Sequence, residues 1–558
     1  MSAVRTLTGQ IVDLHTRRVF AGRLEWHRGR LTRLAADAAG QGGPLILPGF
    51  VDAHIHLESS LLPPAEFARL AVVHGTVATV SDPHEIANVL GVAGVDYMIR
   101  DARRTPLKCN FGAPSCVPAT TFETAGAKLE ARTVARLLAR REVRFLSEVM
   151  NFPGVLARDP SLLAMIAAAR ARGKPVDGHA PGLRGAEAAR YAAAGIATDH
   201  ECFTWAEARD KLAAGMKILI REGSAARNFA ALAPLLRTHP DRVMFCCDDL
   251  HPDLLMGGHL DRHVRRALAA GFDRFDVLRA ASVNPVAHYG LEVGLLREGD
   301  PADFIVVDDW RRFRVRQTYL GGELVAAGGR SRLPRLRPVT LNRFCAEPRA
   351  PADFEVPAPS AAPMLNVIEA INGQLITRHR QMPAKVEAGR IVADPRRDLL
   401  KIAVVNRYVR RAPTAIGFVR GFGLREGAIA SSVAHDSHNL VVVGASDAAL
   451  AAAVNLVIAR RGGLALAARG RSAVLPLPIA GLMSDLDGRT VARRYSQLDR
   501  MAKELGSRPE APFMTLSFMA LLVIPDLKLS DRGLFSAARW GWVPVVEPAG
   551  GEKKTPAE

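Results

Sequence analysis

Long apolar runs and aromatic side chains are both scarce in this sequence. Aromatic residues make up 6% of the 558 residues. Arg or Asp interrupts the apolar stretches well short of the ~18 residues that a membrane-spanning helix requires. The first twenty residues contain no apolar core of the kind found in signal peptides. We therefore expect a cytoplasmic protein that has no membrane partner.

Paired cysteines are also missing. The six cysteines form no CxxC pair and no spacing typical of a disulfide framework (Cys109, Cys116, Cys202, Cys246, Cys247 and Cys345). Disulfides persist in oxidising compartments, whereas thiols stay reduced in the cytoplasm. The cysteine pattern therefore agrees with the expected location.

Acidic residues are fewer than basic ones, and the formal net charge of +18 raises nucleic acids and acidic ligands as partners. The arginines are spread through helix-like stretches such as ARTVARLLARREVRF, with few aromatics between them. This pattern favours a solvated, Arg-rich surface, so we expect no nucleic-acid partner. A nucleic-acid-binding protein that keeps a metal-binding barrel for stability is the alternative from a different functional class.

What the sequence does contain is a conspicuous change of polarity in PGFVDAHIHLESS, residues 48–60. The apolar run 44–51 predicts a short buried strand, and Asp52, His54, His56 and Glu58 follow within a few residues. Alternate side chains of a strand share a face, so His54 and His56 project together. Neighbouring imidazoles can bind one divalent metal, but two hydrogen-bonded histidines at a strand end fit the motif equally well.

The rest of the chain predicts an α/β protein with additional domains. Residues 46–298 alternate short apolar strands (TVATVSD, RFLSEVM, KPVDGHA, IATDHE, KILIREG, RVMFCCDD) with Ala-rich helical segments, which is typical of a (β/α)8 TIM-type barrel. We predict a small flanking β-sandwich from 1–45 and 299–330, the barrel over 46–298, a linker over 331–364, a C-terminal α+β domain over 365–547 and a disordered tail over 548–558.

Polar residues follow the predicted barrel strands, where the active sites of such barrels form. They are His54, His56, Asp82, His84, Glu85, Glu148, His179, Asp199, His200, Glu201, Asp248 and Asp249. Asp248 and Asp249 are adjacent, and we expect Asp248 to face the site and Asp249 to face away. His54, His56, Glu148, His179, His200 and Asp248 are the candidate metal ligands.

Four imidazoles exceed what one open catalytic metal site usually takes. A shared carboxylate resolves the excess, because it can bridge two metals roughly 3.5–4 Å apart. Paired metals stabilise hydroxide near neutral pH, and a nearby aspartate can carry its proton to a leaving group. The predicted reaction is therefore hydrolytic attack on an amide, amidine or similar C–N carbon.

Several motifs carry a family resemblance. They are PGFVDAHIHLESS, DPHEIANVLG, PSCVPAT, VDGHAPGL, DHECFT, REGSAARN, SVNPVAHYGL, GDPADFIVVDD, GFVRGFGLREGAIASSVAHDSHN and LPIAGLMSD. Together they resemble the amidohydrolase superfamily and, more narrowly and over nearly the whole length, its bacterial adenine deaminases. Many amidohydrolases bridge their metals with a carboxylated lysine. FLSEVM offers no lysine, so Glu148 is expected to serve instead.

The resemblance implies two divalent metal ions, manganese or iron, with zinc also compatible. It places His54, His56 and Asp248 on one metal, His179 and His200 on the other, and Glu148 on both. It implies catalytic roles for Asp248, Glu148 and His84, the last in proton transfer or substrate polarisation. The expected reaction converts adenine, a small-molecule substrate, to hypoxanthine and ammonia in a homo-oligomer. The alternative is an amidohydrolase acting on a different purine or on a cyclic amide or amidine.

The C-terminal region adds a polar motif, HDSHN, with His435, Asp436, His438 and Asn439. We expect it to line or close the pocket, and a third metal site is the alternative. Asn406, Ser484 and Asp485 lie in similar short polar motifs, for which a structural and a functional role are equally compatible.

Overall fold

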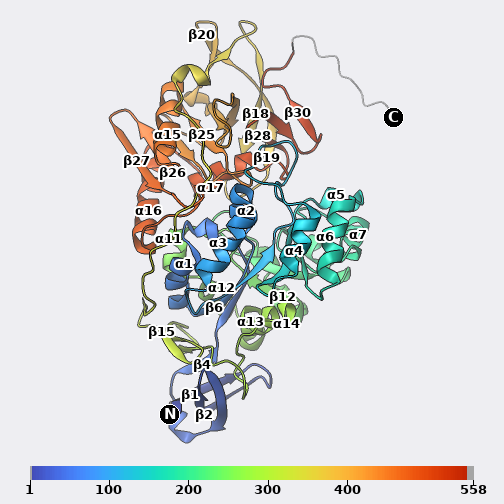
Figure 1. Ribbon diagram of the computed structural model, residues 1–558, viewed down its shortest axis with the longest axis vertical. Helices are drawn as coiled ribbons and strands as arrows, with labels where there is room; N and C mark the ends of the chain where they lie inside the picture. Colours follow the sequence, from blue (N-terminus) through green and yellow to red (C-terminus); the bar gives the residue numbers. More distant parts are fainter. Residues whose placement is uncertain (1–2, 549–558) are drawn as a thin grey trace.

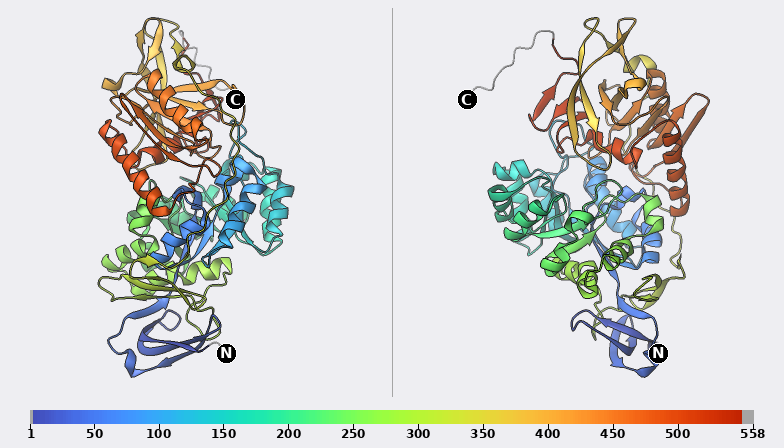
Figure 2. Two further views of the ribbon diagram at one scale, coloured as in Figure 1. Left: turned by 60° about the vertical axis from the view of Figure 1, so that its left-hand side comes forward. Right: turned by 180° about the vertical axis from the view of Figure 1, so that it is seen from behind.

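The computed structural model describes residues 3–548 and has an elongated shape (Figure 1). A sheet containing the N-terminal strands forms one end, an α/β region forms the middle, and the C-terminal domain forms the other end (Figures 1 and 2). The tail predicted over 548–558 lies almost entirely outside the described residues. Among the described residues, none of the helices combines the length and apolar character needed to span a membrane.

The two segments predicted to flank the barrel form one mixed sheet of eight strands, in the order β16-β15-β14-β13-β4-β1-β2-β3. The strands are β1 Arg5–Asp13, β2 Arg18–His27, β3 Arg30–Ala36, β4 Leu45–Pro48, β13 Phe304–Val307, β14 Val315–Leu320, β15 Glu323–Ala327 and β16 Arg330–Ser331. Trp26 of β2 packs edge-on against Phe304 of β13, with ring centroids 5.2 Å apart. The N-terminal strands therefore share a core with strands that follow nearly 300 residues later.

The apolar run 44–51 is not the single strand that we predicted. It is divided at Gly49: β4 pairs with β1 and β13 in the mixed sheet, whereas β5, Phe50–Ile55, belongs to the central region. A Cβ atom at Gly49 would lie 2.2 Å from Val77. Only glycine allows this close approach at the point where the chain passes from one sheet to the next.

The central region contains two parallel sheets, β5-β6-β7-β8-β9 and β10-β11-β12. The strands are β5 Phe50–Ile55, β6 Thr76–Ser81, β7 Lys108–Ala113, β8 Val143–Val149, β9 Val176–Gly178, β10 Thr198–Asp199, β11 Lys217–Arg221 and β12 Val243–Cys246. The five-stranded sheet is curled, and its outer strands lie beside the shorter sheet: the Ala197 amide donates to the Val176 carbonyl (2.8 Å), and Ile55 forms a parallel bridge with Asp248. β7 was absent from the predicted strands because KCNFGA has no apolar period.

Helices connect these parallel strands, as strand crossovers require, and α11 to α14 follow the last of them and lead to β13. They are α1 Pro64–Ala71, α2 His84–Leu90, α3 Val92–Ala102, α4 Ala131–Leu138, α5 Phe152–Leu156, α6 Pro160–Arg170, α7 Gly185–Ala193, α8 Trp205–Ala213, α9 Phe229–Leu232, α10 Leu235–Thr238, α11 Pro252–Gly257, α12 Leu260–Ala269, α13 Arg274–Ala281 and α14 Val283–Tyr289. The start of α6 is well defined, because Asp159 accepts hydrogen bonds from the amides of Ser161 and Leu162 and Pro160 occupies the first turn.

The C-terminal domain is built on an eight-stranded sheet in the order β19-β18-β23-β22-β25-β24-β26-β27. Its strands are β18 Met364–Ala370, β19 Thr377–Pro383, β22 Leu400–Val405, β23 Thr414–Arg420, β24 Ala428–Ser431, β25 Leu440–Gly444, β26 Gly463–Ala468 and β27 Arg471–Pro476. Two smaller sheets contain β17 Val356–Pro357, β20 Lys385–Glu387 and β21 Arg390–Val392, and β28 Leu527–Ser530, β29 Gly533–Ser536 and β30 Gly541–Val543. The domain also has helices α15 Asp447–Ala459, α16 Gly488–Glu504 and α17 Pro512–Ser517.

The C-terminal domain is tied to the loop that follows β7. Asp531 accepts a hydrogen bond from the Thr124 amide (2.9 Å) and another from the Asn406 side chain (2.7 Å). Asn439 of the HDSHN motif donates to the Thr124 carbonyl (2.8 Å). These bonds place the HDSHN motif beside the carboxyl ends of the central strands.

Candidate active site

The six predicted ligands come together around one carboxylate, that of Glu148 at the end of β8. Its Oε1 atom lies 3.2 Å from Nε2 of His56 and 3.9 Å from Nε2 of His54. Its Oε2 atom lies 2.6 Å from Nδ1 of His179 and 3.2 Å from Nε2 of His200. Each oxygen of one buried carboxylate therefore faces its own pair of imidazoles.

Asp248 completes the half of the cluster that contains His54 and His56. Its Oδ1 atom lies 3.4 Å from Nε2 of His54 and 3.2 Å from Nε2 of His56. The Asp248 amide donates to the His54 carbonyl, and the His56 amide donates to the Asp248 carbonyl. Asp248 has a φ of 56°, an uncommon backbone conformation for a residue other than glycine, and it turns the chain immediately after β12.

The donor atoms of this cluster fit divalent metals. Nε2 of His54 and Nε2 of His179 are buried without a hydrogen-bond partner among the described residues. Such orphaned nitrogens are costly unless they coordinate an ion. Burial alone would raise the pKa of Glu148, but His179, His200 and His56 hold that pKa well below its usual range. The anionic carboxylate and the imidazoles form a nitrogen and oxygen donor set suited to divalent ions such as Mn, Fe or Zn.

His84, at the start of α2, lies on the rim of the cluster. Its Nδ1 atom is 3.0 Å from Oδ2 of Asp82 and 3.5 Å from Oε1 of Glu148. Asp82 also orients His56, because its carbonyl oxygen lies 3.2 Å from Nδ1 of that ring and leaves Nε2 directed at the cluster.

We had expected Asp249 to face away from the site, but the structure shows that it faces the site. Its side chain lines the same cavity as Asp248, and its carboxylate accepts a hydrogen bond from the Ser59 hydroxyl (2.5 Å). The reversed φ of Asp248 explains the difference, since the alternation of strand side chains no longer holds after β12.

Arg221, at the end of β11, is a site residue that we had not predicted. Its fully buried guanidinium contacts both Glu201 and the Oδ2 atom of Asp248. Burial disfavours its charge, but Glu201 and Asp248 raise the pKa of Arg221 above its ordinary value. The only sequence signal was the Arg in REGSAARN, which follows an apolar strand like the predicted ligands.

Replacing Arg221 with methionine is expected to destabilise the fold strongly. The change leaves Glu201 and Asp248 buried without their counter-charge, a loss of about 3–5 kcal/mol. The midpoint of urea unfolding of the metal-free protein measures the effect. Arg227→Met is the matched control, because Arg227 is 41% exposed and its ion pair with Glu510 contributes ~1 kcal/mol or less. Equal midpoint shifts in the two variants would contradict this role of Arg221.

A second polar cluster joins α2 to the HDSHN motif. Glu85 contacts Nδ1 of His435 (2.6 Å) and Nε2 of His438. This grouping of donor atoms is compatible with a bound metal ion and equally with ion pairs between the three side chains. His435 and Asp436 line the cavity above Glu148, in agreement with the expected location of the motif. Asn406 binds Asp531, and the Ser484 amide donates to the Leu61 carbonyl; neither residue lines the cavity.

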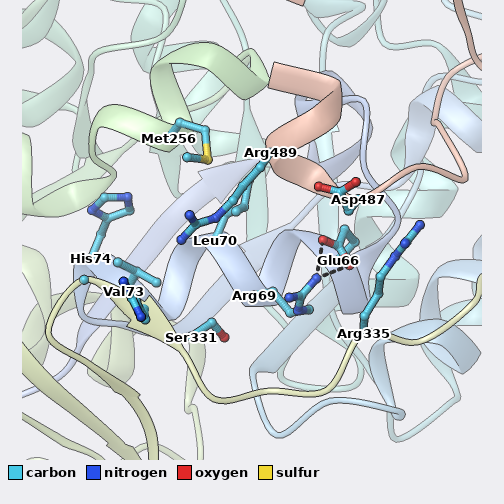
Figure 3. Close-up of a pocket in the computed structure, with 12 residues that line it drawn as sticks. Glu66, Arg69, Leu70, Val73, His74, Met256, Ser331, Arg335, Asp487 and Arg489 are labelled. Atoms are coloured by element: carbon cyan, nitrogen blue, oxygen red, sulfur yellow. Dashed lines mark hydrogen bonds and ion pairs between the residues drawn. The ribbon is translucent and has the colours of Figure 1, made fainter. Parts of the chain in front are cut away.

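The cavity over the cluster is small. A larger hollow lies elsewhere, between α1, the segment around Ser331 and the start of α16 (Figure 3). Arg69, Arg335 and Arg489 surround that hollow, and Arg69 is paired with Glu66. Among the described residues, this hollow and the small cavity share no lining residue. Because the Glu148 cluster lines the small cavity, the chemistry is assigned to the small cavity.

Comparison with known proteins agrees with this geometry. The amidohydrolase family model matches residues 45–325, and the model of the adenine deaminase C-terminal domain matches residues 374–540. A protein of Salinibacter ruber named adenine deaminase is 58% identical over 545 residues, covering 97% of this chain and 99% of that protein. The chain belongs to the adenine deaminases of the amidohydrolase family. The predicted family resemblance is thus confirmed.

Other adenine deaminases also match this chain over nearly its whole length. The adenine deaminase of Sulfurovum sp. is 55% identical over 95% of this chain and 98% of its own length. That of Methanosarcina mazei is 48% identical over 96% of this chain and 98% of its own length. The match to the amidohydrolase model contains the Glu148 cluster, and the match to the C-terminal domain model contains Asp436. Both sides of the cavity therefore lie within matched regions.

Proposed function

We propose that this protein deaminates adenine by hydrolysis, producing hypoxanthine and ammonia. The observation that carries the proposal is the Glu148 carboxylate, whose two oxygens each face a separate pair of imidazoles. Membership of the adenine deaminases supplies the substrate.

We propose that two divalent metals, manganese or iron, bind here. His54, His56 and Asp248 would hold one ion, His179 and His200 the other, and Glu148 both, as the grouping of donor atoms supports. When bound, such a pair supplies water acidified enough to act as a nucleophile near neutral pH.

The protein's own residues transfer protons and polarise the substrate. The Asp248 carboxylate accepts the proton of the attacking water and returns it to the departing amine, while Arg221 holds the carboxylate in place through Oδ2. His84, oriented by Asp82, polarises the purine ring from the rim of the cluster. Burial of these groups excludes bulk water and so strengthens each electrostatic interaction.

We also propose the finer architecture. Bonds at both junctions of the two parallel sheets support one closed (β/α)8 barrel over 46–298. The Leu31 amide donates to the Asp300 carbonyl, so β3 lies near the start of β13; this supports a small sandwich over 1–45 and 299–330. A linker over 331–364, whose β17 and first β18 residue already pair with the next domain, an α+β domain over 365–547, a homo-oligomeric state and a cytoplasmic location complete the proposal.

Adenine turnover tests the proposed activity directly. Protein loaded separately with Mn, Fe or Zn should deplete adenine and release one ammonia per adenine, and removal of the metal by a chelator should abolish the reaction. Readdition of the ion should restore it. If pyrimidines, hydantoins or other purines turn over and adenine does not, the related-hydrolase alternative is correct instead.

A further inference from the structure

The C-terminal domain supplies one complete wall of the cavity over Glu148. Leu375, Phe518 and Leu521 contribute apolar surface, and Asp436 contributes a carboxyl group. The His435 ring stacks on Phe518, with centroids 4.4 Å apart and an interplanar angle of 16°. These residues follow the last proposed metal ligand by more than a hundred positions, so the wall is separate from the ligand set.

Asp436 is a polar group of this wall whose bonding capacity is unused, and Nε2 of His435 is another. Its side chain is 2% exposed, and Oδ2 has no hydrogen-bond partner among the described residues. Its other oxygen, Oδ1, lies 3.8 Å from Nε2 of His84, beyond hydrogen-bonding distance. A buried carboxyl oxygen without a partner is costly unless a ligand supplies the missing donor.

The position of Asp436 relative to Glu148 indicates what that ligand presents. The His84 ring separates the two carboxyl groups, since Nδ1 faces Glu148 (3.5 Å) and Nε2 faces Asp436 (3.8 Å). Because His84 fills the space between them, the two carboxyl groups lie apart along the lining of one cavity. A ligand held at Glu148 in this cavity has Asp436 as the carboxyl group at its far side.

We propose that Asp436 determines specificity for the free purine base, by accepting a hydrogen bond from the N–H group of its five-membered ring. The inference rests on the proposed adenine chemistry and adds the residue that recognises the far edge of the substrate. A carboxyl oxygen accepts such a bond in either protonation state of the group. A substituent at N9, such as methyl or ribose, removes the donor and places carbon against a buried carboxyl.

Asp436→Ala tests the assignment through a ratio. Competitive inhibition of adenine turnover is measured with hypoxanthine and with 9-methylhypoxanthine, in the wild-type protein and in the variant. Asp436→Ala should weaken inhibition by hypoxanthine by about 10- to 100-fold, the value of a hydrogen bond to a charged group. Inhibition by 9-methylhypoxanthine should change little. The preference for the unsubstituted base then disappears. Asp436→Asn keeps an acceptor oxygen and should restore part of the preference.

Asp398→Ala is the matched control. Asp398 is a buried carboxylate of the same domain that accepts hydrogen bonds from the Gly421 and Gly423 amides, far from the cavity lining. Its loss should lower thermal stability and leave the inhibition ratio unchanged. An unchanged ratio in Asp436→Ala, with active wild-type protein, overturns the Asp436 assignment alone. A wild-type protein without adenine turnover overturns the proposed function, and this inference with it.

Discussion

Glu148→Gln should lose one of its two metals and reduce turnover by on the order of 10³-fold or more, judged from the cost of leaving buried charge unpaired. The amide keeps the shape of the side chain but removes the negative charge shared by the two imidazole pairs. Two dications held close together in a weakly screened site repel strongly, and the Glu148 charge offsets this repulsion. Metal content per chain, together with the rate of adenine turnover, measures both effects.

A second buried glutamate provides the comparison for Glu148. Glu66 is 4% exposed and pairs with Arg69 in the separate hollow of Figure 3. Glu66→Gln should therefore retain both metals and normal turnover. Should Glu148→Gln itself keep two metals and near-normal turnover, the bridging ligand is another residue.

Asp248→Asn should behave differently, with most of the metal retained and turnover reduced by about 10²- to 10⁴-fold, the usual contribution of a positioned proton carrier. Asparagine still offers an oxygen to the site beside His54 and His56. It cannot accept the proton of water and return it to the amine. Metal content and turnover measured beside those of Glu148→Gln therefore separate the two proposed roles.

The neighbouring aspartate is the control for Asp248. Asp249 lines the same cavity, but its carboxylate accepts a hydrogen bond from Ser59, whereas the Asp248 carboxylate lies against His54 and His56. Asp249→Asn should reduce turnover much less. A larger loss in Asp249→Asn than in Asp248→Asn would assign proton transfer to Asp249.

Much of the site could be predicted from the sequence because its ligands follow recognisable strands. His179 follows β9 and His200 follows β10, and parallel strands bring their carboxyl ends to one edge. Local patterns failed where tertiary contacts decide the outcome. β7 is buried without periodicity, and Pro234 lies at the point where helix α9 ends and α10 begins.

Arg221 was not predicted from the sequence, and Asp436 was predicted only as part of a motif that lines or closes the pocket. Both depend on partners distant in the chain. Arg221 gains its role from Glu201 and Asp248, which follow the neighbouring strands β10 and β12 and lie outside its own motif. Asp436 gains its position from the docking of a whole domain onto the loop around Thr124. No local spacing records either relationship.

The wall of the cavity is made last. All six proposed ligands precede residue 249, whereas Asp436 and Phe518 follow after about 190 further residues or more. At translation rates of ~5–20 residues per second, the ribosome takes roughly 10–40 s to extend the chain from the final ligand to Asp436. During that interval the nascent chain carries every donor atom of the proposed metal site without the wall that buries them. Ions can thus reach their ligands from open solvent before the C-terminal domain exists.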